Sequence, residues 1–277
     1  MSEHHIQPSH VLHEHHFNTP LQDYSPEIRQ LVLDYTLQLA DSSLILSHRL
    51  SEWCGHGPIL EQDLAMSNIS LDLIGEARSL YQYAAELEGK GRTEDDLAYL
   101  RDAVEYKNPL LVEQPNGDFG DTIMRQFLFD TFHYFYLKEL QQSSDLRLAA
   151  IAEKSLKESG YHIKWSSEWV IRLGDGTEES KKRIEKAVDN LWTFSGELFQ
   201  PTPTEKALQE QGIIPDYTPV KAEWEKHVAK VFEEATLAVP QDQWMQSGGK
   251  TGKHSEHLGY ILAELQYLQR AYPGLTW

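Results

Sequence analysis

The chain has 277 residues, enough for one well-buried domain or two small ones. Its 25 Lys and Arg against 43 Asp and Glu give a formal charge of −18, which disfavours binding to nucleic acid or to anionic lipid surfaces. The 40% hydrophobic content is too high for a disordered protein, yet no apolar run approaches the roughly 18 residues of a membrane helix. A single cysteine, Cys54, excludes an internal disulfide.

Residues 1–24 are predicted to form a flexible, polar tail. Clustered histidines of this kind bind transition metals adventitiously, but these lack a regular spacing on any credible helix. The first residues also lack the basic-then-apolar pattern of a secretory signal, so we expect a cytoplasmic protein. The histidines of the tail are His4, His5, His10, His13, His15 and His16.

Four long amphipathic helices are predicted at residues 25–50, 60–87, 118–141 and 146–173. Apolar residues recur there at steps of three and four positions, which is one face of a helix. Ser25 followed by Pro26 is typical of a helix start. No segment alternates as a strand would, so the fold class is all-α.

The second and third long helices are separated by residues 88–117, which include a short predicted helix at 95–105. A connection of this length can cross a bundle from end to end, as in ferritin-like folds. Further helices at 178–199, 220–238 and 254–269 would pack around the bundle. Prolines interrupt the stretch after residue 200, so we expect it to be less regular. We therefore predict a ferritin-like four-helix bundle with additional C-terminal helices, forming one domain over residues 25–277.

Ferritin-like bundles hold two metal ions with a Glu from each of two helices and a Glu-x-x-His from each of the other two. No Glu-x-x-His occurs in the four long helices of this chain. The nearest patterns are Asp130 with His133 at i,i+3, and Glu158 with His162 at i,i+4. Both histidine positions of a metal site are therefore in doubt.

One acid from each long helix could nevertheless join a common site. A di-metal oxygen-activating centre is one interpretation, and a degenerate site without metal, in which ion pairs and hydrogen bonds compensate the buried acids, is the other. The second is favoured, with no metal expected and with Arg49, Arg78, Arg125, Lys157 or His162 as possible compensating groups. The candidate residues are Asp41, Asp72, Asp130, Glu158 and His162.

Two further features have structural interpretations. Cys54 lies near His56, which is compatible with a nucleophile, but packing of a buried loop is the favoured interpretation. Aromatic residues surround the helix at 118–141 on several faces, more than one core stripe needs, so we expect some to cover a subunit interface. The aromatic residues are Phe127, Phe129, Phe132, Tyr134, Phe135 and Tyr136.

Several segments closely resemble the C subunits of 1,2-phenylacetyl-CoA epoxidases, in the phenylacetic acid degradation protein family. The resemblance runs from about residue 25 to the C-terminus and does not include the His-rich tail. It is carried by residues 50–58 (LSEWCGHGP), 86–92 (ELEGKGR), 95–101 (DDLAYLR), 110–119 (LLVEQPNGDF), 166–180 (SSEWVIRLGDGTEES), 256–259 (EHLG) and 266–273 (QYLQRAYP).

The resemblance implies a ferritin-like subunit of a bacterial multicomponent monooxygenase of aerobic phenylacetate degradation. In that family an A subunit holds the di-iron centre and binds the CoA thioester, and the C subunit is its non-catalytic structural partner. A small B subunit and an NADPH-dependent reductase with flavin and an iron–sulfur cluster complete the system. The resemblance thus implies no catalytic residue and no cofactor in this chain.

Two hypotheses follow from the sequence. The first is a non-catalytic structural subunit that pairs with the di-iron subunit and stabilises it. The alternative is an autonomous di-metal carboxylate oxygenase or oxidase that uses the candidate residues named above. Metal content and activity of the isolated chain distinguish the two.

Overall fold

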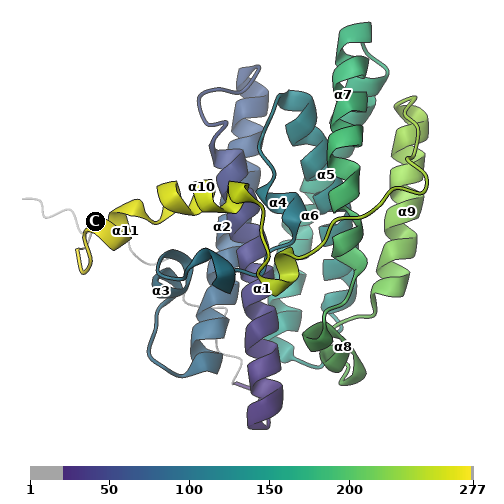
Figure 1. The fold of residues 1–277 in the computed structure, drawn as a ribbon. Coiled ribbons are helices and arrows are strands. Elements are labelled where there is room, and N and C mark those ends of the chain that lie inside the picture. Colours follow the sequence, from purple (N-terminus) through teal and green to yellow (C-terminus); the bar gives the residue numbers. More distant parts are fainter. Residues whose placement is uncertain (1–20, 276–277) are drawn as a thin grey trace, which may run out of the picture.

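The computed structural model describes residues 21–275. Its centre is a bundle of four long helices, and the described part of the chain contains no strand, which confirms the all-α prediction (Figure 1). Each long helix begins and ends within two residues of its predicted bounds. The bundle helices are α1 (Pro26–Ser51), α2 (Leu60–Glu88), α5 (Phe119–Leu140) and α6 (Leu146–Gly174).

Local chemistry defines where the bundle helices begin and end. The side chain of Ser25 caps α1, whose first residue is Pro26. Asp118 and Asp145 cap α5 and α6, each accepting two backbone N–H groups of the first turn. Gly89 ends α2 in the left-handed conformation, with φ of 66°. These residues set the lengths of the helices that carry the central side chains.

The long connection between α2 and α5 contains three short helices rather than the single one predicted at 95–105. Arg101 lies between the first two, and its side chain is buried against the bundle. Their bounds are α3 (Glu94–Tyr99), η1 (Ala103–Glu105) and α4 (Leu110–Glu113).

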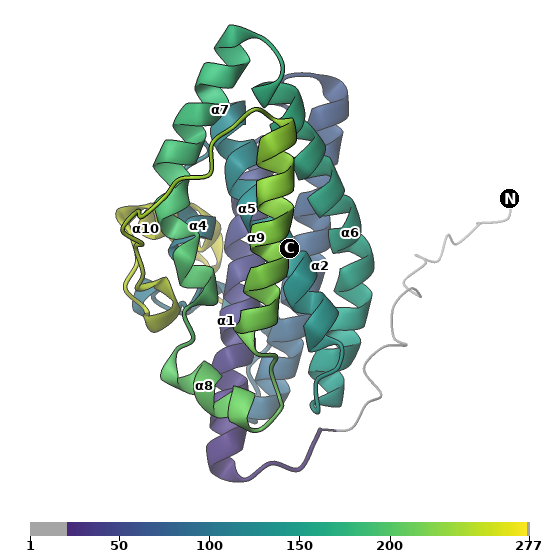
Figure 2. The ribbon, with the colours of Figure 1, turned by 90° about the vertical axis from the view of Figure 1, so that its right-hand side faces the viewer.

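A second layer of helices covers one side of the bundle (Figure 2). Helices α7 (Glu178–Leu191) and α9 (Tyr217–Glu234) pack on α5 and α6, and α8 (Pro203–Glu210) packs on α1. The predicted helix at 178–199 was too long, because its last turns are the 3₁₀ segments η2 (Trp192–Phe194) and η3 (Gly196–Phe199).

The aromatic residues of α5 are covered largely by this second layer, which accounts for most of them, and the expectation that some cover a subunit interface stays a prediction. Phe127 stacks on Phe232 of α9 with ring centroids 6.1 Å apart. Tyr136 lies 5.7 Å from Tyr217 at the start of α9. None of the six aromatic side chains is exposed.

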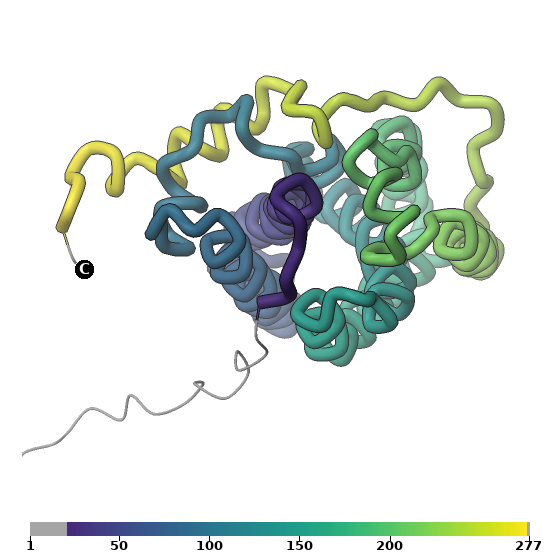
Figure 3. Tube along the Cα trace, turned by 90° about the horizontal axis from the view of Figure 1, so that it is seen from below, coloured from purple at the N-terminus to yellow at the C-terminus, as the bar shows by residue number. Residues whose placement is uncertain are grey.

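The C-terminal segment leaves α9, crosses the connection between α2 and α5, and ends in an arm outside the bundle (Figures 1 and 3). Gly249 lies so close to the backbone of Asn108 and Leu110 that a Cβ there would overlap it. The predicted helix at 254–269 is divided at Gln266, whose buried side chain donates to the Arg101 carbonyl at 3.0 Å. The elements are η4 (Gly249–Thr251), α10 (Glu256–Leu265) and α11 (Tyr267–Ala271).

Most of the predicted tail lies outside the described residues, including all of its histidines. Its last residue, Tyr24, donates a hydrogen bond to Asp145 at 2.8 Å. The expected burial of Cys54 is wrong, because this side chain is exposed while the neighbouring Trp53 packs against Phe119. Between residues 21 and 275, no helix has the length and apolarity that a membrane span requires.

Candidate functional site

A buried polar layer crosses the middle of the bundle, where α1, α2 and α5 each contribute one side chain. Ser43 donates a hydrogen bond to Glu76 Oε1 at 2.7 Å, and His133 Nε2 lies 3.0 Å from the same oxygen. The three side chains are almost fully shielded from solvent. A carboxylate in this position needs such partners, because burial without them strongly disfavours its charge.

Glu76 and His133 shift each other's pKa in the direction of an ion pair. Burial alone would raise the pKa of Glu76, but the charge and hydrogen bond of His133 outweigh it and hold that pKa below its usual value. Burial likewise opposes the charged form of His133, yet Glu76 raises its pKa. The pair therefore places one positive and one negative charge side by side in the core.

A second carboxylate–imidazole pair joins α2 to α6. His162 Nε2 lies 3.0 Å from Asp72 Oδ2, and His162 is buried while Asp72 is partly exposed. Glu158 lies beside them, and burial followed by repulsion from Asp72 raises its pKa. These three predicted site residues are therefore neighbours.

Asp130 of α5 belongs to the same polar region but has weaker compensation. Its Oδ1 accepts a hydrogen bond from Gln126 at 2.6 Å. Burial raises the pKa of Asp130 to about 6, and the nearby His162 and His133 offset only part of that effect.

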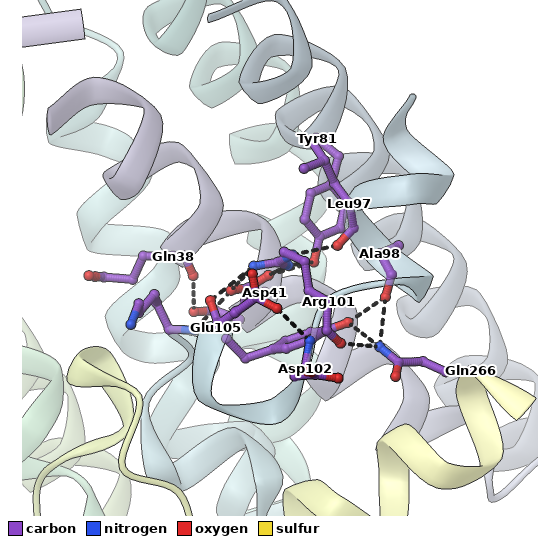
Figure 4. Close-up of polar contacts among 12 residues, drawn as sticks. Gln38, Asp41, Tyr81, Leu97, Ala98, Arg101, Asp102, Glu105 and Gln266 are labelled. Carbon is purple, nitrogen blue, oxygen red and sulfur yellow. Dashed lines mark hydrogen bonds and ion pairs between the residues drawn. The ribbon is translucent and has the colours of Figure 1, made fainter. Parts of the chain in front are cut away.

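Asp41, the candidate from α1, lies in a different place (Figure 4). It forms a buried ion pair with Arg101 of the α2–α5 connection and accepts from Tyr81 at 2.6 Å and from the Lys107 backbone at 2.9 Å. Arg101 in turn stacks on Tyr106, 4.3 Å from the ring centre. Asp41 thus connects α1 to the crossover connection and does not join the other candidates.

The groups expected to compensate the buried acids were mostly the wrong ones. Of those named, only His162 pairs with a candidate acid. Arg49 and Arg78 bind Glu52 and Glu94. Arg125 donates to the Gln114 carbonyl and the Asn116 side chain. Asp41 and Glu76 are paired instead with Arg101 and His133, which sequence reasoning did not select as compensating groups.

Two residues of the layer, Glu76 and His133, were missed as site candidates. The pattern that included His133 was visible, because it follows Asp130 by three positions. Glu76 follows Asp72 by four positions and lies on the same face of α2. A search for acids one helical turn apart would have found it.

A small cavity of about 30 Å³ adjoins this layer between α1 and α5. Glu76 and His133 contribute to its lining, together with Phe129 and Tyr136. Pockets for drug-sized ligands are roughly 300–1,000 Å³. The cavity is therefore far too small for a CoA thioester.

The donor set of the layer does not fit a di-metal centre. The α1 position nearest to Glu76 is filled by Ser43, a hydroxyl rather than a carboxylate. Each imidazole has one ring nitrogen 3.0 Å from a carboxylate oxygen. Within residues 21–275, no three or more His, Cys, Asp or Glu side chains are grouped as metal ligands. What the arrangement offers chemically is adhesion between helices through carboxylate–imidazole contacts.

A family model and a protein relative of known name both place this chain in the same protein family. Residues 17–277 match the family described as phenylacetic acid catabolic protein. A relative from Escherichia coli (strain K12), the C subunit of 1,2-phenylacetyl-CoA epoxidase, is 51% identical over 243 residues. The match covers 88% of this chain and 98% of the relative.

Proposed function

Because the chain belongs to the phenylacetic acid catabolic protein family, we propose that it is the non-catalytic C subunit of a 1,2-phenylacetyl-CoA epoxidase. The similarity to the E. coli C subunit extends over nearly the whole length of that relative, which supports this role over that of another subunit. The complex would add one oxygen atom of O₂ to the aromatic ring of a CoA thioester. This subunit would pair with the di-iron A subunit and stabilise it.

The observation that carries the non-catalytic role is the pairing within the polar layer. Glu76 bonds to His133 and Asp72 to His162, so the carboxylates of α2 face imidazoles of α5 and α6. These contacts hold the helices together at the level where a ferritin-like bundle would otherwise bind metal. In the proposed complex the di-iron centre and the thioester site belong to the A subunit, and the flavin and iron–sulfur cluster to the reductase. We further propose that the complex includes a small B subunit and that this chain is located in the cytoplasm.

The test is metal analysis of the purified chain followed by reconstitution. We expect less than one iron per chain after purification from iron-supplemented cells, and no O₂ consumption by the chain with phenylacetyl-CoA and reductant. Adding the A and B subunits and the reductase should restore epoxidation. Two irons per chain with turnover by the chain alone would favour an autonomous oxygenase and reject the proposal.

A control variant separates structural from chemical roles of the layer. In the reconstituted complex, His133→Gln should lower the stability of the subunit but leave turnover per assembled complex within about twofold. A loss of turnover in fully assembled complex, at unchanged stability, would assign His133 to the chemistry and contradict the proposed role.

A further inference from the structure

The polar layer alternates carboxylates and imidazoles from the surface of the bundle to its core. Asp72 is the outer member, with 34% of its side chain exposed, and His162 Nε2 lies 3.0 Å from it. At the inner end, His133 Nε2 lies 3.0 Å from the buried Glu76. Asp130 connects the two pairs, because it interacts electrostatically with both imidazoles and precedes His133 by three positions on the same face of α5.

The atoms of Asp130 and of the two imidazoles that lack a hydrogen-bond partner are atoms that exchange protons. Each imidazole engages a carboxylate of α2 through Nε2, which leaves the buried Nδ1 of His133 and of His162 without a partner. Asp130 accepts from Gln126 at Oδ1, and its buried Oδ2 lacks a partner, because the nearby Ser166 hydroxyl donates to the His162 carbonyl at 2.9 Å. Buried polar atoms without partners are costly, and a proton held in common would lower that cost.

The charges of the layer do not balance unless it holds such a proton. Asp72, Glu76 and Asp130 are three carboxylates, whereas His133 and His162 supply two positive charges at most. The excess falls on Asp130, which is 1% exposed. Binding a proton is the usual way in which a protein avoids an uncompensated charge at a buried site.

The other charged groups around the layer do not supply the missing positive charge. Glu158 of α6 is a further carboxylate, and burial raises its pKa. Lys154, the lysine that interacts with Glu158, is exposed. Lys250 lines the same cavity as His133, but it is already paired with the buried Glu205 at 2.9 Å.

The remaining helices that pack on the layer contribute neutral contacts. From α1 the layer receives the Ser43 hydroxyl, which donates to Glu76. The nearest histidine of α9 is His227, whose ring lies 3.0 Å from the Ser167 hydroxyl of α6. The proton that balances Asp130 must therefore come from solvent.

From this geometry we propose that Asp130, His133 and His162 bind one proton in common, which the folded protein takes up from water by way of Asp72. The proton resides on Asp130 Oδ2 or on an imidazole nitrogen, and it returns to water without a change in any other bond. Its loss leaves Asp130 as a buried carboxylate in a layer with excess negative charge, which weakens the contacts of α2 with α5 and α6. The layer is thus a pH-sensitive fastening of the bundle, whether or not the proposed function holds.

The test follows the histidine rings of the full-length chain by NMR between pH 5 and pH 9. His133→Gln and His162→Gln identify the two ring signals. In the wild type both signals should show the same two inflections, because strongly interacting groups titrate as one unit. Asp130→Asn should remove one inflection and move the remaining step of each ring down by about 0.5 pH units or more, because the negative charge that favours the protonated rings is gone.

Asp34→Asn is the matched control, since it removes the same charge from an exposed site on α1, where the carboxylate accepts from Gln30. This variant should leave both rings unchanged. The His227 ring, whose pKa burial lowers, is an internal reference that should titrate alike in wild type, Asp130→Asn and Asp34→Asn. Thermal melts establish that each variant is folded.

Two outcomes would overturn the inference. If each ring of the wild type shows a single step at its own pH, the groups titrate independently and no proton is shared. If Asp130→Asn leaves either ring unchanged, that ring does not share a proton with Asp130. Should this variant not fold, the wild-type curves decide alone, since common inflections support the shared proton and separate single steps reject it. None of these results bears on the proposed function, which the reconstitution tests separately.

Discussion

At the scale of single residues, two buried aspartates show opposite ways of holding a charge. Asp41 is fully buried and receives Arg101, the Tyr81 hydroxyl and a backbone N–H. Asp130 is equally buried but has no arginine or lysine against it in the described part of the chain, and its polar neighbours are Gln126, which donates to Oδ1 at 2.6 Å, the Ser166 hydroxyl and two imidazoles. Asp41 is therefore matched by a cation and two hydrogen-bond donors, whereas burial raises the pKa of Asp130 to about 6.

Replacing Asp41 should destabilise the fold strongly. Asp41→Ala leaves Arg101 buried without its counter-charge, a loss of about 3–5 kcal/mol in the free energy of unfolding. Urea denaturation at pH 7 measures it. Asp72→Ala serves as the comparison, because Asp72 is partly exposed and its removal should cost less. Equal losses for the two variants would contradict the role given to Asp41.

Replacing Asp130 should instead stabilise the protein at neutral pH. Its folded pKa of about 6 exceeds its ordinary value of 3.8, so the native state loses stability as the pH rises through that interval. Asp130→Asn removes this cost, which is about 1–3 kcal/mol above pH 6, and keeps the acceptor for Gln126. Urea unfolding should therefore separate variant from wild type at pH 8 but not at pH 4. A destabilised variant at pH 8 would show that the charge of Asp130 is needed.

At the scale of elements, the helical periodicity of the sequence was enough to predict the four-helix bundle. It was not enough to predict which side chains pair across the bundle core. The four long helices carry clear caps and apolar stripes, so their bounds were accurate. Helix α8 was missed among prolines, although Thr202, Pro203 and Glu205 form a capping box with proline at the first position. The Asp41–Arg101 pair spans 60 positions, and no local pattern specifies which partner a buried acid meets over such a distance.

The contact between α6 and the end of α9 depends on a glycine. A Cβ at Gly174 would overlap the Ala235 carbonyl, so Gly174→Ala should separate these helices and cost about 1–3 kcal/mol. Gly75→Ala is the control, because nothing lies within 4 Å of that position in α2. It should raise stability by about 0.5–1 kcal/mol, since alanine favours helix. Thermal unfolding of both variants, with shifts of opposite sign, checks the prediction.

At the scale of the whole molecule, one buried carboxylate joins the arm to the bundle. Glu113 of α4 accepts from His254 Nδ1 at 2.8 Å and from the Ser255 backbone at 2.7 Å. His254 Nε2 lies 2.9 Å from the Tyr106 carbonyl, so both ring nitrogens face acceptors. Burial opposes the charge of His254, but these hydrogen bonds raise its pKa above the usual value.

The attachment of the arm should therefore weaken in alkali. A raised histidine pKa contributes stability that is complete below its unfolded value and is lost as the pH rises through the folded one. His254→Gln should cost about 1–3 kcal/mol at pH 6 and much less at pH 9. Urea unfolding of variant and wild type at both pH values measures the difference. A cost independent of pH would mean that His254 acts as a neutral side chain.

The close contact between Gly249 and the backbone of Asn108 also constrains the order in which the segments fold. The residues that bind the arm precede it by about 140 positions, as the 141-residue separation of Glu113 and His254 shows. During synthesis they leave the ribosome long before the arm does, and domains generally fold from the N-terminal side. The arm can take its place only after the connection between α2 and α5 has reached its native path. A molecule that presents an ordered arm has therefore already formed the connection between α2 and α5.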